Sequence, residues 1–320
     1  MIYSRIAGTG SYLPAQILTN HDLAKRVETS HEWIVERTGI HQRHIAAEDE
    51  TTSQMAAKAS KAAIEAAAVA PTDIELIIFT STTPDKALPT SSCLLQAELN
   101  IPGVPVFDLA AACAGFIYGL AVADQFIRSG TFKTILVVGA DRMSSIIDWQ
   151  DRGTCVLFGD GAGAVVLQAS DTPGVLSTHI KADGRHGDKM YIPTGFSNCR
   201  REDEPTFVHM QGQDVFRFAV QALGEIAEET LKANQLTTSD IDWLVPHQAN
   251  ARIISATAKR LGFSMDKVIL TLAEHANTSA ASVPLALDKG IRDGRIKRGQ
   301  LLLLEAFGGS FVWGSALVRY

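Results

Sequence analysis

The sequence lacks three features that would point to a membrane, to secretion or to nucleic acid. No apolar run approaches the ~18 residues that a membrane-spanning helix needs. Residues 1–16 contain no apolar core of the kind found in a signal peptide. Lysine and arginine form no long block, and 29 basic against 35 acidic residues leave a formal net charge of −6. We therefore expect a cytoplasmic protein with no general affinity for nucleic acid or membrane.

Cysteine is scarce, and the cysteines are widely spaced. Cys93, Cys113, Cys155 and Cys199 include no CxxC pair, which argues against a zinc site and against a disulfide framework. We expect free thiols in a reducing compartment and no bound metal.

The remaining composition is that of a folded enzyme of two domains. The chain has 320 residues, of which 46% are hydrophobic and 20% charged. Strand-like runs lie at 75–82, 104–110, 134–140 and 164–169, and a second set lies at 242–246, 267–273, 301–307 and 315–320. Helix-like segments lie at 52–69, 114–129, 213–235, 249–261 and 279–293. This alternation predicts an α/β fold with largely parallel sheets.

The two sets of elements resemble each other. Matching Ile127-Arg128 to Ile291-Arg292 gives an offset of 164, which carries Cys113 onto Asn277. We interpret this as a duplicated α/β unit, with halves at 1–172 and 173–320 whose sheets pack around shared central helices. The alternative is chance similarity between helix-rich segments.

Cys113 lies between small residues, in DLAAACAGF (108–116), where a strand gives way to a helix. The first turn of a helix offers unpaired N–H groups and a positive dipole end, which favour the thiolate form. The neighbouring alanines and Gly115 leave space for an acyl group. The alternative is that Cys113 is a small buried hydrophobic residue, as most free cysteines are.

His247 and Asn277 also lie between a strand-like and a helix-like segment, in VPHQANARI (245–253) and EHANTSAASVP (274–284). Thr278 and Ser279 are typical helix caps. Taken singly, each of these two polar residues is more typical of a structural role. Together with Cys113 they suggest an acyl-transfer site, whereas a metal site would need more ligands. The stretch FGDGAGA (158–164) precedes a strand, so we interpret it as a turn and not as a phosphate-binding loop.

Seven longer motifs resemble one family nearly end to end. They are GTGSYLP (8–14), EWIVERTGI (32–40), AAACAGF (110–116), DRGTCVLFGDGAGA (151–164), VPHQANARI (245–253), NTSAASVP (277–284) and EAFGGSFVWGSALVRY (305–320). The chain resembles the bacterial β-ketoacyl-acyl-carrier-protein synthases III of the thiolase superfamily, condensing enzymes that begin fatty-acid synthesis. This resemblance implies a duplicated thiolase-like fold with layers α-β-α-β-α, and a homodimer.

The resemblance also implies a reaction in two stages. Cys113 takes the acetyl group from acetyl-coenzyme A, with the backbone N–H groups of Cys113 and Gly309 as oxyanion hole. Malonyl-acyl-carrier protein then loses CO₂, and His247 and Asn277 donate hydrogen bonds to the enolate oxygen. The product is acetoacetyl-carrier protein, and coenzyme A thioester is a substrate, so no cofactor is expected.

Further site residues are carried over from the family. Trp33 and Arg152 match a pair that sandwiches the adenine of coenzyme A, Arg37 matches a phosphate partner, and Thr29 lies in the matching loop. The alternative for Trp33 and Arg37, spaced i, i+4, is one face of an amphipathic helix. Residues that match the substrate channel, or its gate beside the nucleophile, are Gly212, Phe216, Phe307 and Leu88.

Four basic residues are expected near the channel mouth. Arg252, Arg217, Lys259 and Arg260 would attract an acidic carrier protein to an otherwise acidic enzyme. The alternative for each is a solvated helix face.

Three positions depart from the family pattern. Ala276 and Ser310 replace glycines, and a positive φ at such a position would strain alanine by about 1 kcal/mol. Leu88 stands where well-known members have an aromatic residue that reaches into the partner subunit's pocket, so a preference for acetyl groups is open.

The sequence argues against two of three alternative functions and leaves the third open. A degradative thiolase would need a second cysteine near the C-terminus, and none follows Cys199. A relative that condenses branched or longer acyl groups, or that makes a secondary metabolite, would keep the same three residues. A non-catalytic carrier-binding subunit would usually lack the nucleophile, so Cys113 argues against it.

Overall fold

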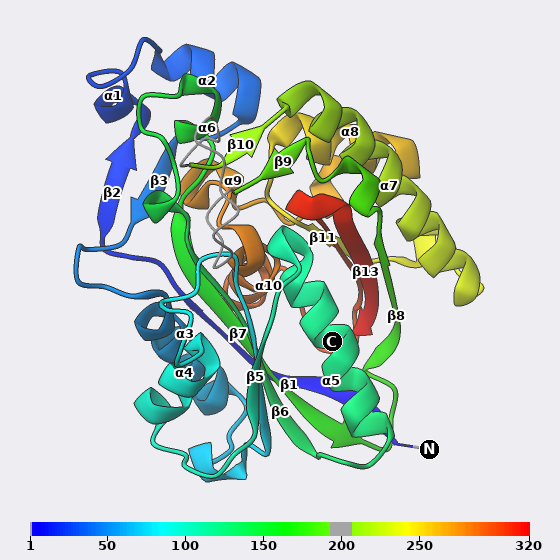
Figure 1. Cartoon of the computed structure of the whole chain (residues 1–320). Helices are drawn as coiled ribbons and strands as arrows, with labels where there is room; N and C mark the ends of the chain where they lie inside the picture. Colours follow the sequence, from blue (N-terminus) through cyan, green and yellow to red (C-terminus); the bar gives the residue numbers. More distant parts are fainter. Residues whose placement is uncertain (1, 193–206) are drawn as a thin grey trace.

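The computed structural model describes residues 2–192 and 207–320 (Figure 1). Cys199 therefore lies outside the described residues. Within the described part, no helix has the length and apolar character needed to cross a membrane.

The first sheet has five strands in the order β1-β7-β6-β4-β5. The strands are β1 (Tyr3–Tyr12), β4 (Leu76–Thr80), β5 (Val106–Leu109), β6 (Thr134–Arg142) and β7 (Asp160–Ser170). β4 pairs parallel with both β5 and β6, whereas β7 is antiparallel to β6 and to β1.

The second sheet has four strands in the order β11-β12-β13-β8. The strands are β8 (Val175–Ala182), β11 (Trp243–Pro246), β12 (Leu301–Gly308) and β13 (Val312–Arg319). Only β11 and β12 are parallel, and the other two pairs are antiparallel. The expectation of largely parallel sheets is therefore wrong: both sheets are mixed.

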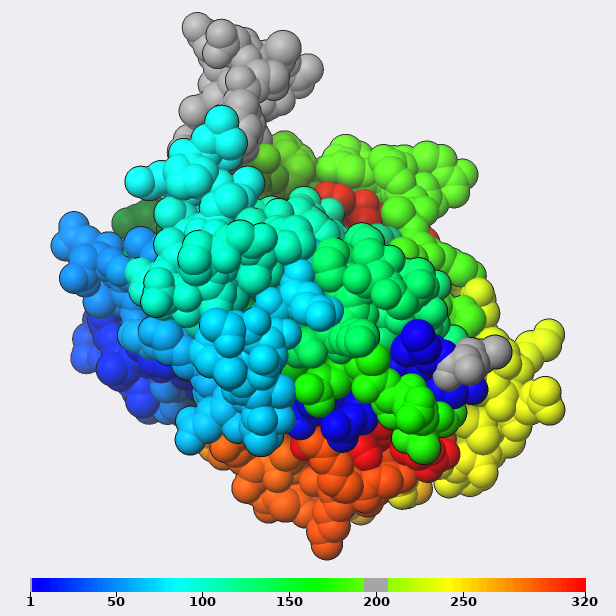
Figure 2. Space-filling view, turned by 90° about the horizontal axis from the view of Figure 1, so that it is seen from below, coloured from blue at the N-terminus to red at the C-terminus, as the bar shows by residue number. Residues whose placement is uncertain are grey.

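Helices form three layers around the two sheets (Figure 1). α3 (Thr52–Ala66) and α4 (Ser91–Leu99) cover the outer face of the first sheet, and α7 (Gly212–Ala233) and α8 (Ala251–Leu261) cover that of the second. α5 (Gly115–Arg128) and α10 (Ser282–Arg292) lie between the sheets, where one apolar cluster takes side chains from both. The resulting order α-β-α-β-α is that of the duplicated thiolase-like fold. The face shown in Figure 2 consists mainly of first-half segments, coloured cyan to green.

Close backbone contact explains a glycine at the centre of the fold. A Cβ at Gly139 of β6 would lie 2.2 Å from the carbonyl oxygen of Ala280. No other residue permits this approach of the second half's central turn to the first sheet. In the same way Gly163 lies inside β7 and packs against α10, so the interpretation of residues 158–164 as a turn is wrong from Asp160 onward.

The described residues also form shorter helices and strands. They are β2 (Gln16–Thr19), β3 (Gln42–Ile45), β9 (Met190–Tyr191), β10 (His209–Met210), α1 (Asn20–Leu23), α2 (His31–Thr38), α6 (Arg152–Cys155) and α9 (Leu272–His275). The strand expected at 267–273 is wrong: Val268 makes one parallel bridge to Leu244, and α9 follows.

The repeat shows in the topology, with a different offset from the expected one. β4 and β11 begin at Leu76 and Trp243, and β6 and β12 begin at Thr134 and Leu301, so the offset is 167. Cys113 therefore corresponds to Ala280, and the match of Cys113 to Asn277 is wrong by three residues. The expected boundary between 172 and 173 falls between β7 and β8, and we keep it as a proposal about domains.

Candidate active site

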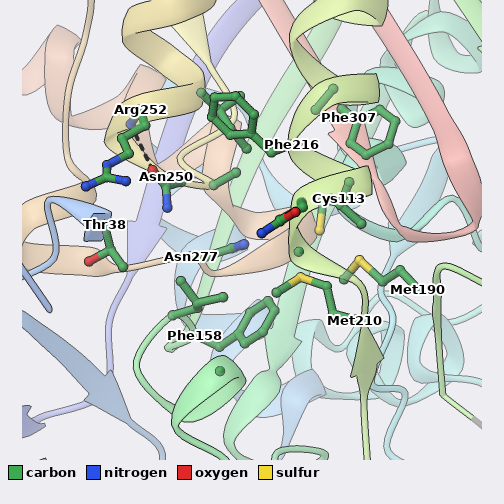
Figure 3. A pocket seen from close by; sticks show the side chains of 18 of the residues that line it. Thr38, Cys113, Phe158, Met190, Met210, Phe216, Asn250, Arg252, Asn277 and Phe307 are labelled. Carbon is green, nitrogen blue, oxygen red and sulfur yellow. Dashed lines mark hydrogen bonds between the residues drawn. The ribbon is translucent and has the colours of Figure 1, made fainter. Parts of the chain in front are cut away.

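A cavity of about 510 Å³ takes lining residues from both halves of the chain (Figure 3). Cys113 comes from the first half, and His247 and Asn277 come from the second. All three side chains are at least nine-tenths buried. The structure thus brings the expected set together in one cavity.

Cys113 lies in the 3₁₀ turn Ala112–Ala114, directly before α5. Its thiol donates a hydrogen bond to the Ser279 hydroxyl at 3.4 Å. Burial raises the pKa of Cys113 to about 11, and this rise is opposed by the hydrogen bond with the Ser279 hydroxyl and by the backbone N–H groups of Gly309 and Cys113 itself. Burial therefore opposes the thiolate form that the sequence predicts for Cys113.

His247 follows β11, and its backbone N–H donates to the carbonyl oxygen of Glu305 at 2.8 Å. Burial lowers the pKa of its imidazole to about 3, so the ring is neutral at physiological pH. Nδ1 is shielded from solvent and has no hydrogen-bond partner among the described residues. A neutral imidazole carries one N–H and can donate one hydrogen bond to a substrate oxygen.

Asn277 is fixed by its own loop. Its Oδ1 accepts from the backbone N–H of Ser279 at 2.9 Å, and its backbone N–H donates to the carbonyl oxygen of Leu157 at 3.0 Å. Because the oxygen is occupied, the amide Nδ2 is the end that remains for a ligand in the cavity. Thr278 and Ser279 do not act as side-chain caps, and α10 begins only at Ser282.

The site therefore offers one nucleophile and several neutral donors. The Gly309 and Cys113 N–H groups lie within hydrogen-bond reach of the sulfur, where the oxyanion of an acyl-transfer intermediate would form. A Cβ at Gly308 would lie 2.6 Å from the Cys113 backbone nitrogen, so only glycine fits beside the nucleophile's turn. No cluster of three or more metal-ligating side chains occurs in the described ranges.

Comparison with known proteins gives a consistent result. Two family models match, 3-oxoacyl-[acyl-carrier-protein] synthase III at residues 107–184 and the C-terminal model of the same name at residues 231–320. The β-ketoacyl-[acyl-carrier-protein] synthase III of Methylococcus capsulatus is 58% identical over 318 residues, which cover 99% of each chain.

Solved structures agree with the sequence relatives. The 3-oxoacyl-[acyl-carrier-protein] synthase III of Aquifex aeolicus is 44% identical with a TM-score of 0.94, covering 99% of this chain and 100% of that one. The chain belongs to the β-ketoacyl-acyl-carrier-protein synthase III family. It is accordingly an acyltransferase-type condensing enzyme. The priming β-ketosynthase of the R1128 polyketide pathway is also similar, at 36% identity and a TM-score of 0.94, covering 99% of this chain and 96% of that one.

In this synthase the residues expected to hold adenine are in mutual contact. The guanidinium carbons of Arg152 and Arg37 lie 4.7 and 4.8 Å from the ring centroid of Trp33. All three line the cavity. A planar base could enter between Trp33 and Arg152 only after the arginine swings aside. Thr29 does not line the cavity, although its hydroxyl is buried without a partner among the described residues.

The expected channel residues divide into two groups. Gly212, Phe216 and Phe307 line the cavity, and Phe307 packs edge-on against Phe311 at 5.4 Å. Leu88 does not line the cavity of its own chain and is 82% exposed. Its expected contact with a partner's pocket stays a prediction.

The expected basic patch is only partly formed. Arg217 and Arg252 line the cavity, and Lys259 is exposed elsewhere on α8. Arg260 instead bonds Glu228 at 3.3 Å and the carbonyl oxygen of Gln221 at 3.2 Å, and it packs over Gly224 of α7. These contacts join α7 and α8, and the assignment of Arg260 to carrier docking stays a prediction.

Both replaced glycines lie at positive φ. Ala276 has φ 58 and ψ −161, and Ser310 has φ 64 and ψ 7. The first of these conformations is almost restricted to glycine. The loop that carries Asn277 and the turn that carries Gly309 are therefore both strained, although each still presents its functional group to the cavity.

Sequence reasoning missed several residues of the site. Met190 and Met210, on β9 and β10, line the cavity; nothing in their local sequence indicated this. Asn250 caps α8 through its Oδ1 and donates to the carbonyl oxygen of Arg37 at 3.1 Å. Its position before a helix was the available signal.

Proposed function

We propose that the enzyme condenses acetyl-coenzyme A with malonyl-acyl-carrier protein to acetoacetyl-acyl-carrier protein, and so begins fatty-acid synthesis. One observation carries the proposal: a buried thiol, a neutral imidazole and an oriented carboxamide share one cavity. The printed names of the relatives support the same reaction.

In the first stage, the Cys113 sulfur attacks the thioester carbon and the carbon–sulfur bond to coenzyme A breaks. The coenzyme A sulfur takes up the proton that Cys113 loses, so coenzyme A leaves as the free thiol. The Cys113 and Gly309 N–H groups stabilise the oxyanion. Trp33, Arg152 and Arg37 bind the nucleotide, with stacking suited to a planar base and guanidinium groups suited to phosphate.

In the second stage, malonyl-carrier protein loses CO₂ and its enolate carbon attacks the acyl carbon on Cys113. The bond between that carbon and the Cys113 sulfur breaks, and the released thiolate takes up a proton from water. Negative charge develops on the enolate oxygen, and Asn277 Nδ2 and the N–H of His247 donate to it. Neutral donors are sufficient because loss of CO₂ replaces removal of a proton. Each well-placed donor contributes about 3–4 kcal/mol, or roughly 10²–10³ in rate.

Mass spectrometry after incubation with acetyl-coenzyme A tests the first stage. We expect one acetyl adduct on Cys113, absent from Cys113→Ala. His247→Ala and Asn277→Ala should still acquire the adduct and should lose decarboxylation of malonyl-carrier protein. Normal condensation by either variant would refute these roles, and the same assay over branched and longer acyl-coenzyme A would decide the starter.

We also propose binding partners and a cellular location for the enzyme. β5 is an edge strand of the first sheet, which supports a homodimer joined through sheet edges, measurable by light scattering. Arg217 and Arg252 at the cavity favour an acidic carrier protein, whose binding should weaken with salt. A reducing cytoplasm suits a free thiol nucleophile.

A further inference from the structure

Ser279 contacts the nucleophile, yet the proposed reaction assigns it no role. Its hydroxyl accepts the hydrogen bond of the Cys113 thiol at 3.4 Å and lies 3.3 Å from the Thr82 hydroxyl. Ser279 is 1% exposed, so its hydroxyl is shielded from solvent and bonds to neighbouring protein groups.

Asp141, at the end of β6, fixes Ser279 in this position. Its Oδ2 accepts from the backbone N–H of Ala280 at 2.9 Å. Its Oδ1 accepts from four donors in the loop after β4: the Ser81 hydroxyl, the Thr82 N–H, and the Thr83 N–H and hydroxyl. Burial raises the pKa of the Asp141 carboxyl, and bonds from these groups and from the Ser279 hydroxyl oppose that rise. The carboxylate thus holds a loop of each half beside the sulfur.

The backbone at Ser279 is strained, and a serine with only a structural role would not need such a conformation. Its φ is 52, and Ala112, which precedes Cys113, has φ 44. These residues occupy equivalent places in the two halves, 167 positions apart. Strained residues persist where the surrounding structure holds them, commonly at functional sites. Here both directly flank the sulfur's hydrogen bond.

We propose that Ser279 is a positioning residue that stabilises the ionised form of Cys113: its hydroxyl accepts from the resting thiol and turns to donate to the sulfur as the proton leaves. This inference rests on the proposed role of Cys113 as nucleophile. Turning the Ser279 hydroxyl away from Asp141 costs little free energy, because the Asp141 carboxylate keeps five other hydrogen-bond donors. A hydrogen bond to an ionised group is stronger than one between neutral groups.

Two other titratable side chains, those of Asp141 and His247, could influence the ionisation of Cys113. The charge of Asp141 opposes ionisation of the thiol, and His247 is neutral because burial lowers its pKa to about 3. Neither supplies a positive charge to the sulfur. The thiolate therefore depends on hydrogen-bond donors, and among the described residues the Ser279 hydroxyl is the side-chain group that bonds to the sulfur.

The test is the rate of Cys113 alkylation by iodoacetamide between pH 7 and 9, followed by peptide mass mapping of the whole enzyme. In Ser279→Ala we expect the rate to fall about ten- to hundredfold at every pH, because fewer sulfurs are ionised. Ser279→Gly accepts the positive φ without strain, and it should show the same fall if the hydroxyl is responsible.

Ser282→Ala is the matched control. Ser282 is equally buried in the next turn, and its Oγ accepts from the Gln248 N–H, so Cys113 should react at the wild-type rate. An unchanged or faster rate in Ser279→Ala, or a normal rate in Ser279→Gly, would overturn the inference. Absence of acetylation in the wild-type enzyme would instead refute the proposed function, so the two failures are distinct.

Discussion

Glu305 lies in the middle of β12 with a fully buried side chain. Neither carboxyl oxygen has a hydrogen-bond partner within the described part of the chain. Burial alone raises the pKa of this carboxyl to about 8 from the ordinary 4.5. Glu305 is therefore predominantly a neutral acid at physiological pH in the folded enzyme and an anion in the unfolded chain.

The sign of the stability change follows from proton binding. Below pH 4.5 both states carry the proton, and Glu305 makes no pH-dependent difference. Between 4.5 and 8 the folded state holds a proton that the unfolded state has released, so folding stability falls as pH rises. Each pH unit costs about 1.4 kcal/mol, and the whole interval costs ~5 kcal/mol.

Glu305→Gln removes this titration while keeping the shape of the side chain. We expect urea unfolding to show the variant gaining on the wild type by about 3–4 kcal/mol between pH 5.5 and 8. Subtracting the two curves cancels the other titrating groups, and an unsatisfied glutamine amide adds only a constant offset. A difference that stays the same from pH 5.5 to 8 would refute the buried neutral acid.

Two substitutions test other features of the structure. Ser310→Gly removes strain of about 1–2 kcal/mol at a positive φ and costs about 0.5–1 kcal/mol in unfolded-state entropy, so thermal unfolding should show a net gain of about 0.5–1 kcal/mol; a loss of stability would contradict the strain. Arg43 is fully buried and donates to Leu18 O, Asn20 Oδ1 and Val156 O, so Arg43→Met should lower urea stability by about 3 kcal/mol or more. Equal stability of that variant would show that these acceptors find other partners.

Much of the candidate site could be predicted from the sequence, because its residues stand in short segments between a strand and a helix. Cys113, His247 and Asn277 each had that local context, and the family motifs supplied their roles. Trp33 and Arg152 are far apart in the chain, and the motifs alone related them. Local patterns predicted which segments carry chemistry, and the duplication indicated that the halves would meet.

The remainder depended on packing that no local pattern encodes. β7, β8 and β13 pair antiparallel with their neighbours. The alternation of strands and helices in the sequence does not show this, so the prediction of largely parallel sheets was wrong. The pKa of Cys113 is raised by burial, which depends on residues from both halves and is not visible in the local sequence. The hydrogen bonds of Arg260 to Glu228 and Gln221 on α7 likewise depend on helix packing that its local sequence does not show.

The contact of Arg152 with Trp33 opposes the proposed binding of a purine between these two side chains. A purine bound there would have to separate them, and their cation–π attraction, about 0.5–1 kcal/mol at an exposed site, would be subtracted from its affinity. The same contact would re-form when the purine leaves. Release of coenzyme A after acyl transfer would therefore be easy, which would favour turnover over tight binding.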